Sequence, residues 1–170
     1  MPRLRVALIG LGNVEYGAGK LELRSAPAAL LYQMHLKYDA ERAEPVTRFD
    51  SAARTLFLGI RSHGLKVSHT DEEGGALHAE LSTRLPMELA LTLGAVEADL
   101  QLGGLRLTNL SLKSGAADVT VRFEERNPER LREMTLDIGA ASVKIRRAGN
   151  YVFRVQVIAP GKILPRNREP

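Results

Sequence analysis

Residues 89–145 contain one short unit written three times, and this repetition limits the fold more than any other feature of the sequence. The copies are residues 89–100 (LALTLGAVEADL), 110–121 (LSLKSGAADVTV) and 134–145 (MTLDIGAASVKI). When they are aligned on Gly94, Gly115 and Gly139, they lie 21 and 24 residues apart. A repeat period in this range is typical of solenoid proteins, in which each unit stacks on the next.

Aliphatic residues occupy every second position on both sides of each glycine, but the phase of the alternation shifts by one residue at the glycine. Side chains of a strand alternate between faces, so this shift would turn the second apolar set outward unless the chain turned a corner. Each copy is therefore predicted to be strand, glycine corner and strand, with a positive φ at the glycine. The columns expected to face the interior are Leu89/Leu110/Met134, Leu91/Leu112/Leu136, Val96/Ala117/Ala141, Ala98/Val119/Val143 and Leu100/Val121/Ile145.

Two other interpretations of the repeat fit less well. A helix is disfavoured because the apolar period is two, β-branched residues are frequent and glycine interrupts each copy. The leucine-rich repeat has a similar period, but Asn109 comes one residue too early for its pattern. The sequence thus predicts an all-β fold, a single-stranded β-helix or solenoid-like stack of short strands with glycine corners. Residues 14–23 form a more distant copy, with Gly17 at its corner.

The first half of the chain lacks regular copies but keeps the alternation typical of strands. Strands are predicted at residues 3–9, 20–23, 30–38, 56–60 and 65–68, with a short edge strand at 46–49, and residues 77–85 favour a strand over a helix. We expect an antiparallel meander. We divide the chain into an N-terminal β region (1–86), the repeat solenoid (87–162) and a loose tail (163–170). Between the second and third copies, Asn127 and Pro128 are predicted to open a single helical turn, as N-cap and first residue.

Composition excludes several classes of protein. The chain has 170 residues, of which 44% are hydrophobic but only 5% aromatic, so its core must be aliphatic. There is no cysteine, which excludes disulfides and cysteine-ligated zinc. The net charge of +4 is spread along the chain, unlike the concentrated charge and interleaved aromatic residues of a nucleic-acid-binding surface. The longest apolar run, residues 6–11, is far shorter than the roughly 20 residues of a membrane-spanning helix.

Two glycines near the N-terminus, Gly10 and Gly12, follow a predicted strand and resemble the start of a dinucleotide-binding loop. The G-x-G-x-x-G fingerprint requires a third glycine where this chain has Glu15, and it requires a helix to follow. Residues 20–23 alternate like a strand instead. A nucleotide site would therefore need a helix directly after Gly12.

Other candidate chemistry comes from histidine and carboxylate side chains. The chain has four histidines, His35, His63, His69 and His78. The last three flank the acidic loop Asp71, Glu72 and Glu73. A metal site there is one interpretation, although no spacing matches H-x-x-x-H or H-x-H, and exposed histidines on strands are the simpler one. The loop also lacks the alternating oxygen donors of a calcium loop.

Glu97, Asp118 and Ser142 share one outward column of the repeat, which indicates either a cation site or a solvated polar face. No G-x-S-x-G, G-x-x-x-x-G-K-[ST] or H-E-x-x-H motif occurs. No catalytic residue, cofactor or metal is therefore predicted, and the residues singled out are the structural corners Gly17, Gly94, Gly115 and Gly139.

The repeated pattern of alternating leucines, Gly-Ala and alternating aliphatic residues resembles the toast-rack domain of bacterial proteins, a family that includes the C-terminal part of LiaF-like cell-wall-active antibiotic response proteins. Residues 14–60, with their Gly17-Ala18-Gly19 followed by Leu21 and Leu23, resemble the N-terminal region that often precedes a toast rack. The resemblance covers about residues 13–160. It implies a β-helix-like domain without known catalysis, whose relatives are often attached to membrane segments or act in envelope-stress sensing.

The leading hypothesis is a non-enzymatic interaction module, an accessory in envelope-stress sensing or signalling. Its partner would be a protein, with membrane-associated proteins as candidates, and its location the cytoplasm or the cell envelope. The alternative is a structural or adhesin-like surface domain that binds a polymer or carbohydrate. Nucleic acid is not an expected partner.

Overall fold

The structure is a computed structural model that describes residues 4–11, 19–26, 29–38, 40–41, 43–62, 75–140, 142–147, 155–157 and 162–165. All regular elements in these ranges are β-strands. They are β1 (Leu4–Leu11), β2 (Gly19–Ala26), β3 (Tyr32–Lys37), β4 (Ala43–Asp50), β5 (Thr55–Ser62), β6 (Ala76–Ser82), β7 (Met87–Leu93), β8 (Val96–Gln101), β9 (Leu107–Ser114), β10 (Ala117–Phe123), β11 (Glu133–Ile138), β12 (Ser142–Arg147), β13 (Val155–Val157) and β14 (Lys162–Pro165).

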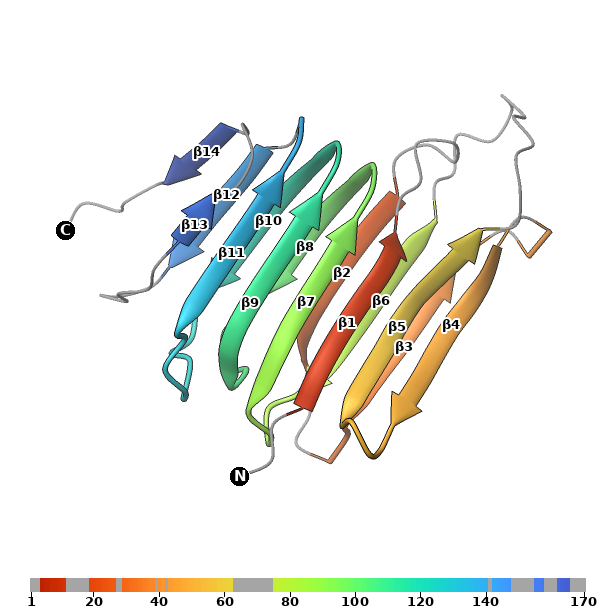
Figure 1. Ribbon diagram of the computed structural model, residues 1–170, viewed down its shortest axis with the longest axis horizontal. Helices are drawn as coiled ribbons and strands as arrows, with labels where there is room; N and C mark the ends of the chain where they lie inside the picture. Colours follow the sequence, from red (N-terminus) through yellow and green to blue (C-terminus); the bar gives the residue numbers. More distant parts are fainter. Residues whose placement is uncertain are drawn as a thin grey trace.

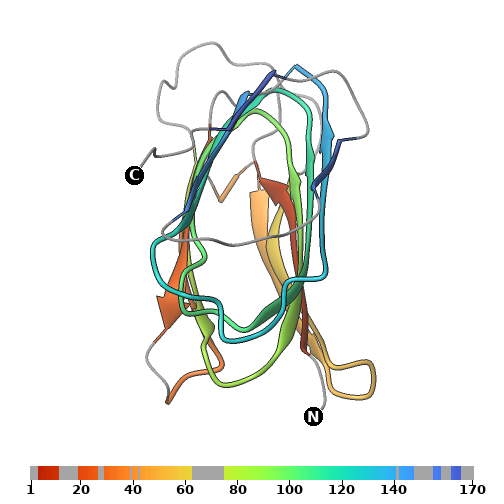
Figure 2. The ribbon, with the colours of Figure 1, turned by 90° about the vertical axis from the view of Figure 1, so that its left-hand side faces the viewer.

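The strands form two seven-stranded sheets that face each other (Figure 1). One sheet has the order β13-β11-β9-β7-β1-β5-β4 and the other the order β14-β12-β10-β8-β2-β6-β3. Each coil of the chain contributes one strand to each sheet, and Figure 2 shows the stacked coils end-on as a flattened ring. The predicted all-β, solenoid-like fold is confirmed.

The register of the repeat copies follows the predicted columns. Leu91 pairs with Leu112, and Leu112 pairs with Leu136 in the next coil. On the opposite sheet, Val119 lies between Ala98 and Val143 in the same way. Ala141 lies outside the described residues. Equivalent side chains of successive copies therefore form columns in the interior, separated by the distance between neighbouring strands. Each short unit buries its apolar face against the units on either side of it.

The core between the sheets is aliphatic, as the composition predicts. Leu23, Leu56, Leu81, Leu100 and Leu136 are fully buried, and Phe123 is the aromatic residue among the buried hydrophobic side chains of the described chain. Buried residues of both halves of the sequence belong to one continuous cluster. The predicted boundary at residue 86 falls between β6 and β7 within this stack. The division of the chain into separate segments there stays a prediction.

The N-terminal coil is not at the end of the stack. β1 pairs in parallel with β5 on one side and with β7 on the other, and β2 lies in parallel between β6 and β8 (Figure 1). The antiparallel meander predicted for the first half is therefore wrong for these strands. Only β3, against β6, and β4, against β5, are antiparallel among the described pairs. Alternation places side chains on faces but is the same for both strand directions, so it could not reveal this arrangement.

Residues 14–18 of the distant copy predicted at residues 14–23 and the strand predicted at residues 65–68 lie outside the described residues, and the described strand that precedes β2 is β1. The expected end of the repeat needs correction. Lys162–Pro165 pairs with β12, where a loose tail was expected from residue 163. Residues 162–165 do not carry the leucine pattern of the repeat. They can still add a strand to the stack, because β12 already provides a strand with which their backbone pairs in parallel.

Candidate functional site

The repeat glycines lie where the chain passes from one sheet to the other. Gly94 separates β7 from β8, Gly115 separates β9 from β10, and Gly139 separates β11 from β12. Gly115 N donates to Leu93 O at 3.2 Å, and Gly139 N donates to Ser114 O at 2.9 Å. The corners therefore continue the ladder of hydrogen bonds between coils. Gly17 lies outside the described residues.

The positive φ expected of these glycines is not found. Gly104, with φ 77°, is the described glycine with a left-handed backbone, and it lies in the opposite turn, between β8 and β9. A different physical reason applies at Gly139, where a Cβ atom would lie 2.9 Å from Gly115 O. A Cβ atom at Gly115 would meet nothing within 4 Å. We propose that glycine is required at Gly139 by close stacking rather than by backbone conformation.

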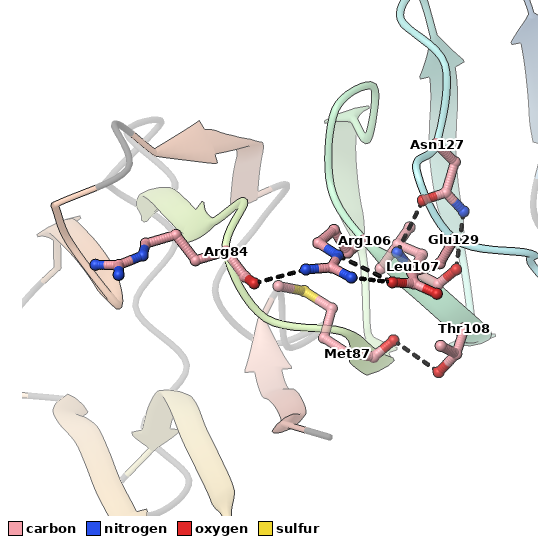
Figure 3. A network of polar contacts seen from close by, with 7 residues as sticks. All are labelled: Arg84, Met87, Arg106, Leu107, Thr108, Asn127 and Glu129. Carbon is pink, nitrogen blue, oxygen red and sulfur yellow. Dashed lines mark hydrogen bonds and ion pairs between the residues drawn. The ribbon is translucent and has the colours of Figure 1, made fainter. Parts of the chain in front are cut away.

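The turns on the other side of the stack carry a network of polar contacts that sequence reasoning missed (Figure 3). Asn127 was predicted to cap a helical turn, but residues 124–132 contain no helix. Its buried side chain instead pairs with the backbone of Leu107: Leu107 N donates to Asn127 Oδ1 at 3.0 Å, and Asn127 Nδ2 donates to Leu107 O at 2.8 Å. The side-chain amide of Asn127 thus makes the two hydrogen bonds that the backbone of a neighbouring strand would make to Leu107.

Thr108 and Arg106 connect this turn to the coils on either side. The register of β7 and β9 slips at Thr108, whose buried hydroxyl donates to Met87 O at 3.1 Å. Arg106 donates from Nη1 to Arg84 O at 3.0 Å and from Nε to Glu129 Oε1 at 2.9 Å. Three successive turns are therefore held together by side chains (Figure 3), which indicates a structural role for this network.

The candidate metal ligands are only in part within the described residues. His63, His69 and the acidic loop at residues 71–74 lie outside them. His78 is exposed, its Nδ1 lies 2.7 Å from Glu22 Oε2, and it sits directly opposite His35 on β3. In the described part of the chain, no group of three or more His, Asp or Glu side chains is placed to hold a metal ion.

The predicted carboxylate column is in register and lies on the outer face, as the alternation indicated. Asp118 pairs with Glu97 on one side and with Ser142 on the other, and Lys20 on β2 is the next residue along the row. Glu97 and Asp118 are exposed. This arrangement is that of a solvated polar surface. Gly10 lies in β1, residues 12–18 lie outside the described residues, and the chain from Gly19 onward is a strand.

The end of the stack formed by β3 and β4 differs from the rest of the surface. We call the described residues from 29 to 50 the cap coil (Figure 1). Leu30, Tyr38 and Phe49 are 40%, 38% and 50% exposed, and they are the exposed large hydrophobic residues of the described chain. Tyr32, Met34 and Leu36 of β3 are only partly buried against the core. Leu30 precedes β3, Tyr38 follows it and Phe49 lies on β4, so the three residues share one coil, and exposed apolar side chains often mark an interaction surface.

Comparison with known families places the chain. A family model described as the N-terminal domain of toast_rack, DUF2154, matches residues 10–146. The chain belongs to this family. The match runs across the predicted boundary at residue 86 and includes the three repeat copies. No curated protein matches the toast-rack chain.

A solved structure from Clostridium sporogenes, described as a "putative cell adhesion protein", has the same fold as the toast-rack chain. It aligns with a TM-score of 0.70 at 15% sequence identity and covers 96% of this chain and 92% of that one. At this identity the likeness concerns the fold. Among the residues that the structure describes, no helix has the length and hydrophobicity to cross a membrane.

Proposed function

We propose that this toast-rack chain is a non-enzymatic interaction module that binds a protein partner through the cap coil. The observation that carries the proposal is that the exposed large hydrophobic residues of the described chain, Leu30, Tyr38 and Phe49, all lie in this one terminal coil. Apolar residues at the centre of an interface supply most of its binding energy, and polar residues around them exclude water.

The proposed biological setting is cell-envelope stress sensing or signalling, with the chain as an accessory protein in the cytoplasm or at the envelope. Membership of the toast-rack family supports this proposal, since the LiaF-like proteins that the sequence resembles act in envelope-stress responses. The partner would accordingly be a membrane-associated protein.

Affinity capture with chemical cross-linking, run separately on soluble and membrane fractions of the source cell, tests the proposal. The exposed cap residue Phe49 is replaced in Phe49→Glu, and Thr92→Glu is the matched control because Thr92 is exposed on β7, in the middle of the stack. We expect one dominant membrane protein with the wild-type chain and with Thr92→Glu, and its loss with Phe49→Glu. Equal recovery by all three chains would exclude the cap coil as the binding surface.

A structural or adhesin-like domain that binds a polymer or carbohydrate is the second candidate, favoured by the described role of the Clostridium sporogenes protein with the same fold. Carbohydrate recognition would use a row of exposed aromatic residues along several coils. The exposed aromatic residues of the described chain, Tyr38 and Phe49, are confined to the cap coil. Retention on isolated cell-wall material without any protein partner would favour this second function.

A further inference from the structure

The four strands at the ends of the two sheets are not equally protected against the addition of another strand. An edge strand presents unpaired N–H and C=O groups, and proteins usually protect such edges with proline, with short strands or with charges. In the described structure, the edge strands are β13 and β14 at one end and β3 and β4 at the other.

Three of these edges carry an evident protection. Within the described ranges, β13 has three residues, β14 has four and ends at Pro165, and β4 contains Pro45 in its interior. Pro45 pairs with Ile60 of β5, and since proline has no N–H, its backbone nitrogen must face away from β5, toward the free edge. A strand adding to β4 would therefore miss the hydrogen bond at Pro45.

Among the described residues, β3 has neither of the first two protections, proline or a short length, and its one charged residue, Lys37, is the last of the strand. The strand has six residues and contains no proline. Ser82 N donates to Leu31 O at 2.9 Å, which fixes the alternation of backbone groups along this antiparallel pair. The N–H and C=O groups of Gln33 and His35 face β6, and those of Tyr32, Met34 and Leu36 consequently face the free edge.

The side chains of β3 specify the chemistry of a partner strand. Tyr32, Met34 and Leu36 pair with the buried residues of β6 and stay partly exposed, so a partner strand can cover them with apolar residues at every second position. The other face of β3 carries Gln33, His35 and Lys37 and no acidic residue. Lys37 also has an interaction within the chain. Acidic residues at the alternate positions of the partner would complement this face.

We propose that the free edge of β3 is a docking site for an extended segment of a partner protein, in which apolar and acidic residues alternate and which adds to the sheet as a further strand. Backbone hydrogen bonds supply affinity in this mode, and the alternating side chains supply specificity. This inference rests on the proposed interaction function and names the strand and the kind of segment involved.

The test uses a synthetic peptide in which valine alternates with glutamate, with a valine–lysine peptide as the charge control. In amide NMR spectra of the whole chain, we expect the valine–glutamate peptide to slow hydrogen exchange at Tyr32, Met34 and Leu36, while the amides of Gln33 and His35 stay unchanged. The valine–lysine peptide should bind more weakly. Protection at β4 instead, or no protection at β3, would overturn the proposal.

Two matched proline variants test the same edge by peptide affinity. Met34→Pro removes an N–H group that faces the free edge of β3, and Thr47→Pro makes the equivalent change on β4. We expect Met34→Pro to weaken binding about tenfold, since one ladder hydrogen bond is lost and a proline ring is added at the edge. Thr47→Pro should leave the affinity unchanged. Met34→Ala, which keeps the N–H group, separates the loss of the side chain from the loss of the donor. Equal weakening by Met34→Ala and Met34→Pro would overturn the hydrogen-bonded mode.

The outcomes for β3 and for the interaction function are separable. A membrane partner that binds wild type and Met34→Pro equally well, but not Phe49→Glu, would support the proposed function and overturn docking on β3. Peptide binding at β3 without any protein partner in either cell fraction would support the edge site and contradict the proposed function.

Discussion

Alanine substitution at two equivalent glycines should have opposite effects on stability. Gly115 and Gly139 occupy the same column of the repeat, and the sequence gives no reason to distinguish them. In the structure a Cβ atom at Gly139 would lie 2.9 Å from the backbone oxygen of Gly115, whereas a Cβ atom at Gly115 would have no neighbour within 4 Å. Neither glycine has a left-handed φ, so backbone strain does not enter the comparison.

The magnitudes follow from these contacts. Gly115→Ala should stabilise the chain by about 0.4–1 kcal/mol, because alanine reduces the conformational entropy of the unfolded state and fits the native backbone. Gly139→Ala meets a backbone atom that can move only with its coil, so overpacking should cost about 1–3 kcal/mol, which exceeds the same entropic gain.

Equilibrium urea unfolding followed by circular dichroism measures both effects as shifts of the midpoint at constant slope. Gly115→Ala serves as the control for Gly139→Ala, since both add one methyl group at a corner. If the two variants shifted the midpoint in the same direction and by similar amounts, close stacking would not be the reason for glycine at Gly139.

Three further substitutions test the core and the turn network. Leu112→Asp, in the centre of a fully buried column, should lower the free energy of unfolding by several kcal/mol, roughly half or more of a typical domain's stability. Thermal unfolding near the wild-type temperature would show that the column does not face inward. Thr92→Asp, exposed on the neighbouring strand β7 and opposite Lys113, is its control and should change stability little. Asn127→Ala should lower the free energy of unfolding in urea by about 2 kcal/mol, because it leaves buried N–H and C=O groups of Leu107 without partners. An unchanged free energy of unfolding would show that this pairing does not stabilise the fold. Thr108→Val keeps the shape but removes the donor to Met87 O, which should cost about 1 kcal/mol, whereas Thr92→Val on the exposed face should be neutral.

The internal columns could be predicted because they depend on short-range pattern alone. Alternation with period two assigns each residue to a face, and copies of one unit align with each other when they stack. Leu91, Leu112 and Leu136 therefore meet in the structure as the repeat indicates. The same reasoning placed Glu97 and Asp118 on the outer face.

The candidate interaction surface could not be predicted in this way. Leu36 and Phe49 lie within strands of alternating sequence, where they are indistinguishable from core residues. They are partly exposed because no further coil covers the cap coil among the described residues. The edge strand predicted at residues 46–49 is confirmed as β4, but the alternation within β3 does not indicate that β3 ends the other sheet. Asn127 and Thr108 were missed for a related reason, since their partners, Leu107 and Met87, belong to neighbouring coils or turns.

The sequence by itself determined that this protein is an aliphatic β-solenoid with polar outer rows. Alternation and repetition are local properties of the sequence, and only one register of stacked copies keeps every apolar side chain inside. Only the tertiary structure decided the order of the coils, with β1 and β2 between later strands, and the reversed direction of β3 and β4. Strand order and direction depend on which distant segments pair, and the alternation of side chains is the same for every choice. The cap coil and its free edge at β3 follow from that order.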